Sequence, residues 1–123
     1  VVAHANLGML LTKAGRTDKA LAHLQKVADA KPESADARRS LGLAMADRGK
    51  YREASVELEE AVKLSRGTDA LALHVLGRVY ADLGRHAEAT QTERRALMAA
   101  TQQGNAKLVE AIAAHLEELG RAP

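Results

Sequence analysis

The chain contains no cysteine, no phenylalanine and no tryptophan, and it has only two tyrosines and two prolines among its 123 residues. Without cysteine there can be no disulfide and no thiolate metal site. Without Phe and Trp the chain offers little from which to build an aromatic cage or a base-stacking platform. Because aromatic residues make up 2% and hydrophobic residues 46%, we expect a core of Ala, Leu and Val, of which Ala and Leu favour helices.

The chain also carries little excess charge of either sign, because its 18 Lys and Arg residues nearly balance its 16 Asp and Glu residues and leave a net charge of +2. The basic doublets Arg38-Arg39 and Arg94-Arg95 have acidic residues nearby in the sequence. A nucleic-acid surface needs a concentrated basic stripe, so we expect no nucleic-acid partner. No stretch approaches the roughly 18 apolar residues of a membrane span, and we expect no membrane insertion.

What the chain does contain is a repeat of about 34 residues, marked by small residues at fixed places. A period of this length is typical of stacked helical hairpins. The sequence therefore predicts an all-α chain with two helices in each repeat. The repeated positions are Leu7-Gly8, Leu41-Gly42 and Leu76-Gly77, then Gly15, Gly49 and Gly84, then Ala20, Ala54 and Ala89.

Helix ends are predicted from the usual end signals. Glycine at the C′ position commonly ends a helix, and we assign this role to Gly15, Gly49, Gly67 and Gly84. Ser, Thr and Asn side chains cap helix N-termini, which predicts caps at Thr17, Ser34, Thr68 and Asn105. The expected units are 1–34, with helices at about 2–14 and 18–30, then 35–68 and 70–103.

A final helix is predicted over about 106–119, within a capping element at 105–120. Its polar residues fall on one side at 100° per residue, and its apolar residues fall on the other. Solenoids need terminal helices with one polar face, because the last repeat otherwise exposes its stacking face. The apolar side comprises Leu108, Val109, Ala111, Ile112, Leu116 and Leu119.

These positions resemble the tetratricopeptide repeat (TPR), a 34-residue helix–turn–helix unit, and the resemblance covers essentially the whole chain. It implies a single domain over 1–123 with about three and a half repeats, built as a right-handed superhelix of seven antiparallel-packed helices. Beyond the shared glycines and alanines, the family's large or closing positions are filled by Leu11, Leu24, Pro32, Met45, Tyr51, Leu58, Leu73 and Tyr80.

The third repeat departs from the family pattern. Thr101 stands where a closing proline is usual, as Arg66 does at the end of the second repeat, and Glu93 occupies a position that is usually large and apolar. Either the second helix of this repeat is rotated slightly, or Glu93 reaches solvent at a loosely packed joint. We favour the second explanation.

In arrays of this family the first helices line a concave groove where ligands usually lie, so the resemblance implies a groove that binds a peptide or protein surface. Arginine can hold a carboxylate through two hydrogen bonds, so Arg39 and Arg78 predict an acidic ligand. The alternative is that they pair with Asp36, Asp47 or Asp82. The predicted partner-binding residues are Asn6, Met9, Lys13, Arg39, Leu43, Leu71, His74 and Arg78.

Some family members clamp a C-terminal carboxylate with Lys and Asn, and that clamp is absent here. Its positions hold Ala5, Met9, Ser40, Leu71 and Val75. None of the five histidines has a second histidine three or four residues away, as a helical metal site would need, and each is expected at or near the surface. No phosphate loop or nucleophile elbow occurs. We therefore predict no enzyme activity, no cofactor and no metal site.

The leading hypothesis is a protein–protein interaction scaffold. The alternatives are a module for structural packing or self-association, and a substrate-recruiting appendage of a larger enzyme. Because the chain begins at Val1 inside the first repeat, we expect a segment or a processed product, so the lack of a signal peptide does not place it. A soluble protein is expected, with the cytoplasm as the default compartment. The bias toward Ala, Arg and Leu is compatible with a bacterial source.

Overall fold

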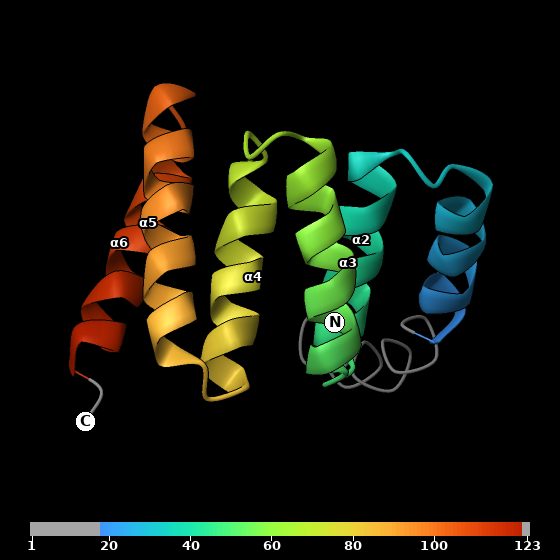
Figure 1. The fold of residues 1–123 in the computed structure, drawn as a ribbon, viewed down its shortest axis with the longest axis horizontal. Helices are drawn as coiled ribbons and strands as arrows, with labels where there is room; N and C mark the ends of the chain where they lie inside the picture. The colour runs from blue at the N-terminus through green and yellow to red at the C-terminus, as the bar shows by residue number, and fades with distance from the viewer. Residues whose placement is uncertain (1–17, 122–123) are drawn as a thin grey trace, which may run out of the picture.

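A computed structural model of the chain describes residues 18–121, which form six helices joined by short loops. The helices lie side by side along the long axis of the molecule (Figure 1). No strand occurs between residues 18 and 121, so the all-α prediction is confirmed. The predicted helix at 2–14, with Gly15 and Thr17, lies outside the described residues. The elements are a helix at 18–30, α2 (Ala35–Asp47), α3 (Tyr51–Leu64), α4 (Ala70–Asp82), α5 (His86–Gln102) and α6 (Ala106–Arg121).

The glycine stops work as predicted after α2 and α4, where Gly49 and Gly84 adopt φ angles of 76° and 78°. After α3 the prediction is off by one residue. Arg66 takes the left-handed C′ position with φ 56°, and Gly67 follows it with φ 76°. The Gly67 amide donates to the carbonyl of Val62 at 2.8 Å, which closes the end of the helix as a Schellman motif does. The insertion after the second repeat is therefore a two-residue left-handed turn.

The N-caps show one further correction. The side chains of Ser34 and Asn105 accept hydrogen bonds from amides three residues ahead, at 3.1 and 3.2 Å, so these caps are confirmed. Thr68 does not cap α4, because its hydroxyl donates back to the carbonyl of Ser65 at 2.7 Å. Asp69 caps α4 instead, with its Oδ1 accepting from the amide three residues ahead at 3.0 Å. An ionised carboxylate at a helix N-terminus also interacts favourably with the helix dipole.

The helices of the second and third repeats cross at glycine. A Cβ atom added to Gly42 would lie 2.6 Å from Cγ of Leu58, and one added to Gly77 would lie 2.6 Å from Cγ of Glu93. Such distances are below van der Waals contact, so only glycine allows these helices to approach as they do. Gly42 and Gly77 thus mark a close helix crossing in both repeats.

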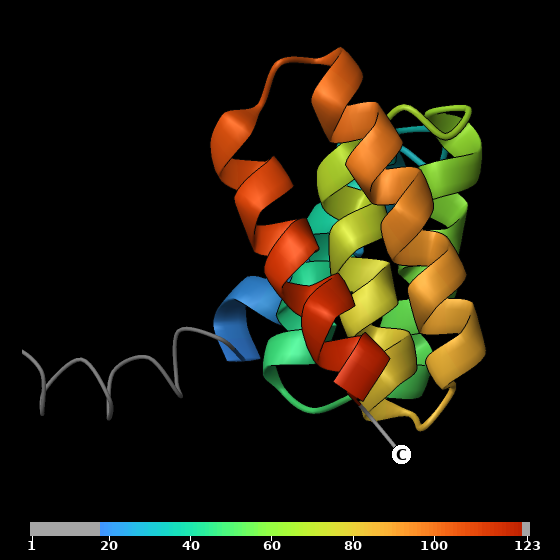
Figure 2. The same ribbon diagram turned by 90° about the vertical axis from the view of Figure 1, so that its left-hand side faces the viewer.

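The last helix, α6, packs against α5 and touches α4, and α4 lies between α5 and α6 in the view of Figure 2. Ile112 is fully buried, and Leu116 and Leu119 are half-buried against the core. Ala111, which we predicted on the inner side, is exposed. None of the helices described here combines the length and the apolar character needed to cross a lipid bilayer.

Candidate functional site

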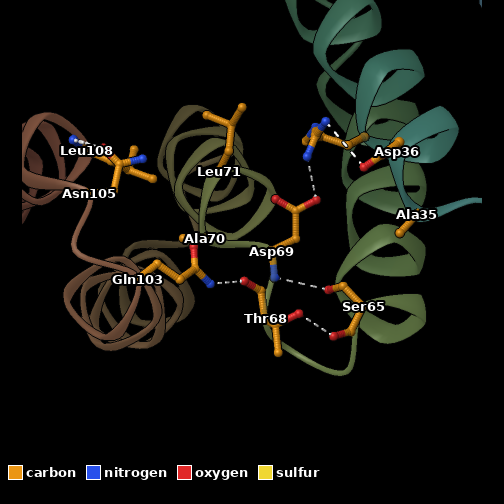
Figure 3. A pocket seen from close by; sticks show the side chains of 11 residues that line it. Ala35, Asp36, Ser65, Thr68, Asp69, Ala70, Leu71, Gln103, Asn105 and Leu108 are labelled. Atoms are coloured by element: carbon orange, nitrogen blue, oxygen red, sulfur yellow. Dashed lines mark hydrogen bonds and ion pairs between the residues drawn. The ribbon is translucent and has the colours of Figure 1, made fainter.

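Three hollows open along the first helices of the repeats. One of about 370 Å³ lies at the N-terminal ends of α2, α4 and α6, and includes Arg39 and Leu71 (Figure 3). A second of about 310 Å³ lies between α2 and α4, and includes Leu43 and Arg78. A third of about 260 Å³ lies between α4 and α6, and includes His74 and Arg78. The five predicted partner-binding residues within 18–121 thus all line one of these hollows. The other three, Asn6, Met9 and Lys13, lie outside the described residues.

Arg39 is held by carboxylates. Its guanidinium lies 2.9 Å from Oδ2 of Asp69 and 3.4 Å from Oδ1 of Asp36. The Asp69 carboxylate is 10% exposed and contacts the guanidinium of Arg39 through one oxygen (Figure 3). Its other oxygen accepts the hydrogen bond that caps α4. Arg39 was expected either to bind an acidic ligand or to pair with a carboxylate of the chain. The structure shows the second arrangement, and Asp69 is a partner that the sequence did not indicate. Arg39 therefore ties α2 to the start of α4.

Arg78 differs from Arg39 in its surroundings. It is exposed, and no carboxylate among residues 18–121 comes within ion-pair distance of its guanidinium. It lines both the α2–α4 hollow, with Asp47 and Asp82, and the α4–α6 hollow, with Glu118. Arg78 is thus placed between two hollows with its hydrogen-bond donors available.

The neighbouring basic residue Arg38 also serves the fold. Its Nη1 donates to Oε2 of Glu57 at 2.9 Å and joins α2 to α3. This hydrogen bond raises the pKa of the Arg38 guanidinium above its usual value. Since both members of the Arg38-Arg39 doublet are engaged by carboxylates, the doublet does not form the open basic stripe that a nucleic-acid surface requires.

Glu93 is the largest departure from expectation. We predicted that it reaches solvent, and this is wrong, because its side chain is 0% exposed. The side chain of Glu93 lies over Gly77, where the missing Cβ leaves room for it. His74, predicted to lie in the groove near the surface, is also buried, with 7% of its area exposed. Its Nδ1 lies 2.8 Å from Oε2 of Glu93, so most of the ring is turned toward the helix crossing.

A third residue completes this cluster from α6. Nδ1 of His115 lies 2.5 Å from the same Glu93 oxygen, and the two imidazole rings stand nearly edge to face, at 75°. The three residues come from α4, α5 and α6, so spacing within a single helix gives no sign of the cluster. The partners are 19 and 22 residues from Glu93. The one available signal was a carboxylate at an apolar repeat position, which calls for buried partners.

Comparison with known proteins agrees with this architecture. Family models described as tetratricopeptide repeat match residues 11–74 and 46–106. The chain belongs to the tetratricopeptide repeat family. A search of curated proteins by sequence finds no match.

Solved structures show the same fold at low sequence identity. PcrH, in complex with the chaperone binding region of PopD, superposes with a TM-score of 0.82 at 20% identity, covering 94% of this chain and 87% of that chain. The translocator chaperone SycD of Yersinia enterocolitica gives 0.82 at 15%, covering 94% and 79%. The TPR2B domain of yeast Sti1, in a pHsp70 complex, gives 0.82 at 16%, covering 97% and 95%. The TPR solenoid predicted from the repeat pattern is thus confirmed.

Proposed function

We propose that this TPR domain is a protein-interaction scaffold that holds a peptide or a protein surface along α2, α4 and α6. The observation that carries the proposal is the row of three hollows on these helices, with exposed Arg78 lining two of them. The complexes of PcrH with a region of PopD, and of Sti1 TPR2B with pHsp70, lend support because the same fold holds a partner there. The scaffold acts by binding, without catalysis and without a cofactor for its function.

Within this proposal the groove residues have different tasks. Arg78 receives an acidic group of the partner, because a planar guanidinium can bind a carboxylate through two hydrogen bonds. Leu43 and Leu71 contact apolar side chains, and Leu71 is 39% exposed. Arg39 keeps α2 and α4 in register through Asp69. We propose that Asn6, Met9 and Lys13 extend the same surface, that residues 1–123 form one domain, and that α6 covers its last repeat.

The experiment is a selection of displayed peptides against the immobilised protein, followed by affinity measurement on the best binder. We expect acidic peptides, whose affinity falls as salt screens the charges over about 10 Å at 0.1 M. Arg78→Glu should weaken binding about tenfold or more, because it removes charge-assisted hydrogen bonds. Arg94→Glu is the matched control, since Arg94 is exposed on α5. An equal loss of affinity in the Arg78→Glu and Arg94→Glu variants would place the ligand elsewhere. The same conclusion would follow if neither Arg78→Glu nor added salt changed the affinity.

A second candidate is self-association through the outer helices. Val56 on α3 is 64% exposed and Met98 on α5 is 65% exposed, so each offers an apolar contact to a second copy of the chain. Sedimentation of the wild type and of the double variant Val56→Ser, Met98→Ser separates the two candidates. A dimer that dissociates only in the double variant would favour self-association over the peptide groove.

A further inference from the structure

Three helices converge on one carboxylate between α4, α5 and α6. His74, Glu93 and His115 each present a ligand atom, and these atoms all lie within 4.8 Å of one another. Two of the three side chains are buried and the third is half-buried. Because each residue sits on a different packed helix, the cluster is held by the fold and does not depend on a loop.

The charge of Glu93 needs a counterpart. A carboxylate removed from water is costly unless it is paired and hydrogen-bonded. Neither Lys nor Arg among residues 18–121 pairs with Glu93, and its partners are two imidazole rings, which carry charge only when protonated. A divalent cation between the three side chains would supply positive charge without protonation of either ring.

We propose that His74, Glu93 and His115 form a zinc site. Two imidazoles and one carboxylate are a ligand set that zinc uses where it keeps one position open. Ligands at about 2.0–2.2 Å from zinc lie about 3.3–3.6 Å apart in a tetrahedral site. The two imidazole nitrogens now lie 2.8 and 2.5 Å from Glu93 Oε2, so each would move outward by about 1 Å or less to admit the ion. This inference does not rest on the proposed peptide groove, although the two share the hollow between α4 and α6.

The site also has an entrance. The hollow between α4 and α6, of about 260 Å³, is lined by both His74 and His115, and by Arg78 and Glu118 with opposite charges. It brings an ion to the two imidazole rings that contact the buried carboxylate, and it leaves room for a water molecule as the fourth ligand. Bound zinc would join α6 to α4 and α5, so it would stabilise the last helix.

Calorimetric titration of the tag-free, chelator-stripped chain with zinc chloride tests the proposal. We expect one zinc ion per chain, a melting temperature raised by zinc and restored by chelator, and a cobalt spectrum typical of a tetrahedral site. The variants Glu93→Gln and His115→Gln should each weaken zinc binding by about tenfold or more. His115 is half-buried, so its variant is expected to fold even if the Glu93 variant does not, and circular dichroism checks both.

The matched control replaces the three other histidines together, as His4→Gln, His23→Gln, His86→Gln. It should bind one zinc ion with unchanged affinity, since the cluster histidines remain. The proposal is overturned if the wild type takes up no zinc at stoichiometric concentration. It is also overturned if the control loses zinc binding while folded His115→Gln retains it.

Discussion

The second and third repeats place different chemistry at the same helix crossing. Leu58 and Glu93 stand 35 residues apart, the step that also separates Gly42 from Gly77. The two side chains lie equally close to their glycines, with the first contact of an added Cβ at 2.6 Å in both repeats. Both side chains are 0% exposed. The backbone geometry is thus the same, while an isobutyl group fills one crossing and a carboxylate fills the other.

The difference shows what each crossing depends on. The second crossing is closed by the apolar side chain of Leu58, which belongs to the same buried core as residues of α4 and α5. The third holds a carboxylate whose partners come from α4 and α6. Arg39 is in register with His74, but it turns to Asp69 and does not enter its own crossing. Of the two crossings, only the third therefore depends on α6 for its stability.

The largest expected effect follows from moving the carboxylate to the second crossing. Leu58→Glu should lower the free energy of unfolding by about 3–5 kcal/mol, because it leaves a buried charge without a partner. The one basic side chain in register, Arg39, is already engaged by Asp69. Urea denaturation measures the change. A loss below about 1 kcal/mol would mean that the second crossing is open to water.

Overfilling the second crossing should also destabilise the protein. Gly42→Leu should cost about 1–3 kcal/mol, because overpacking forces the side chains and backbone apart. Gly120→Leu on α6 is the matched control, since a Cβ there has no neighbour within 4 Å. Thermal melts of the two variants give the comparison. Equal melting temperatures would show that Gly42 does not lie at a close contact.

Changes that preserve shape should separate the two crossings. Glu93→Gln should cost about 1.5–3 kcal/mol, the range for hydrogen bonds to charged groups. Leu58→Met should cost less than about 1.5 kcal/mol, as volume-conserving apolar exchanges do. Both variants are compared by urea denaturation in chelator, so that no metal contributes. A larger loss for Leu58→Met would reverse the comparison.

The smallest expected change in stability comes from replacing the two groove arginines, and it should differ between them. Arg39→Ala should lower stability by up to about 1 kcal/mol, because its ion pair with Asp69 is only partly screened. Arg78→Ala should stay within about 0.5 kcal/mol, as for a surface change. Chemical denaturation checks both values. If Arg78→Ala proved the more damaging, its assignment to ligand binding would fail.

The fold was predictable from the sequence because it follows from local features. Some of these features repeat along the chain, as Gly42 and Gly77 do. Others act within a few residues, as do the helix ends at Gly49 and Gly84 and the N-cap at Ser34. The errors were also local. Thr68 and Asp69 both have capping side chains, and only the observed turn decides which one faces the α4 amides.

The Glu93 cluster could not be predicted in the same way. Its members share no helical spacing, and His115 meets Glu93 only because α6 packs on α5. The groove was partly predictable, since the repeat pattern identifies which helices line it. It does not reveal that Asp69 engages Arg39 while Arg78 stays exposed, because that choice depends on where the α3–α4 turn places a carboxylate.

The most direct test of the third crossing is a double-mutant cycle between Glu93→Gln and His115→Gln, measured by urea denaturation in chelator. Residues in one hydrogen-bond network show coupling energies of about 0.5–3 kcal/mol, whereas independent sites add within about 0.3–0.5 kcal/mol. We predict a coupling of at least about 1 kcal/mol. Additive losses would contradict the account, because Glu93 would then not depend on the imidazole that α6 brings to it.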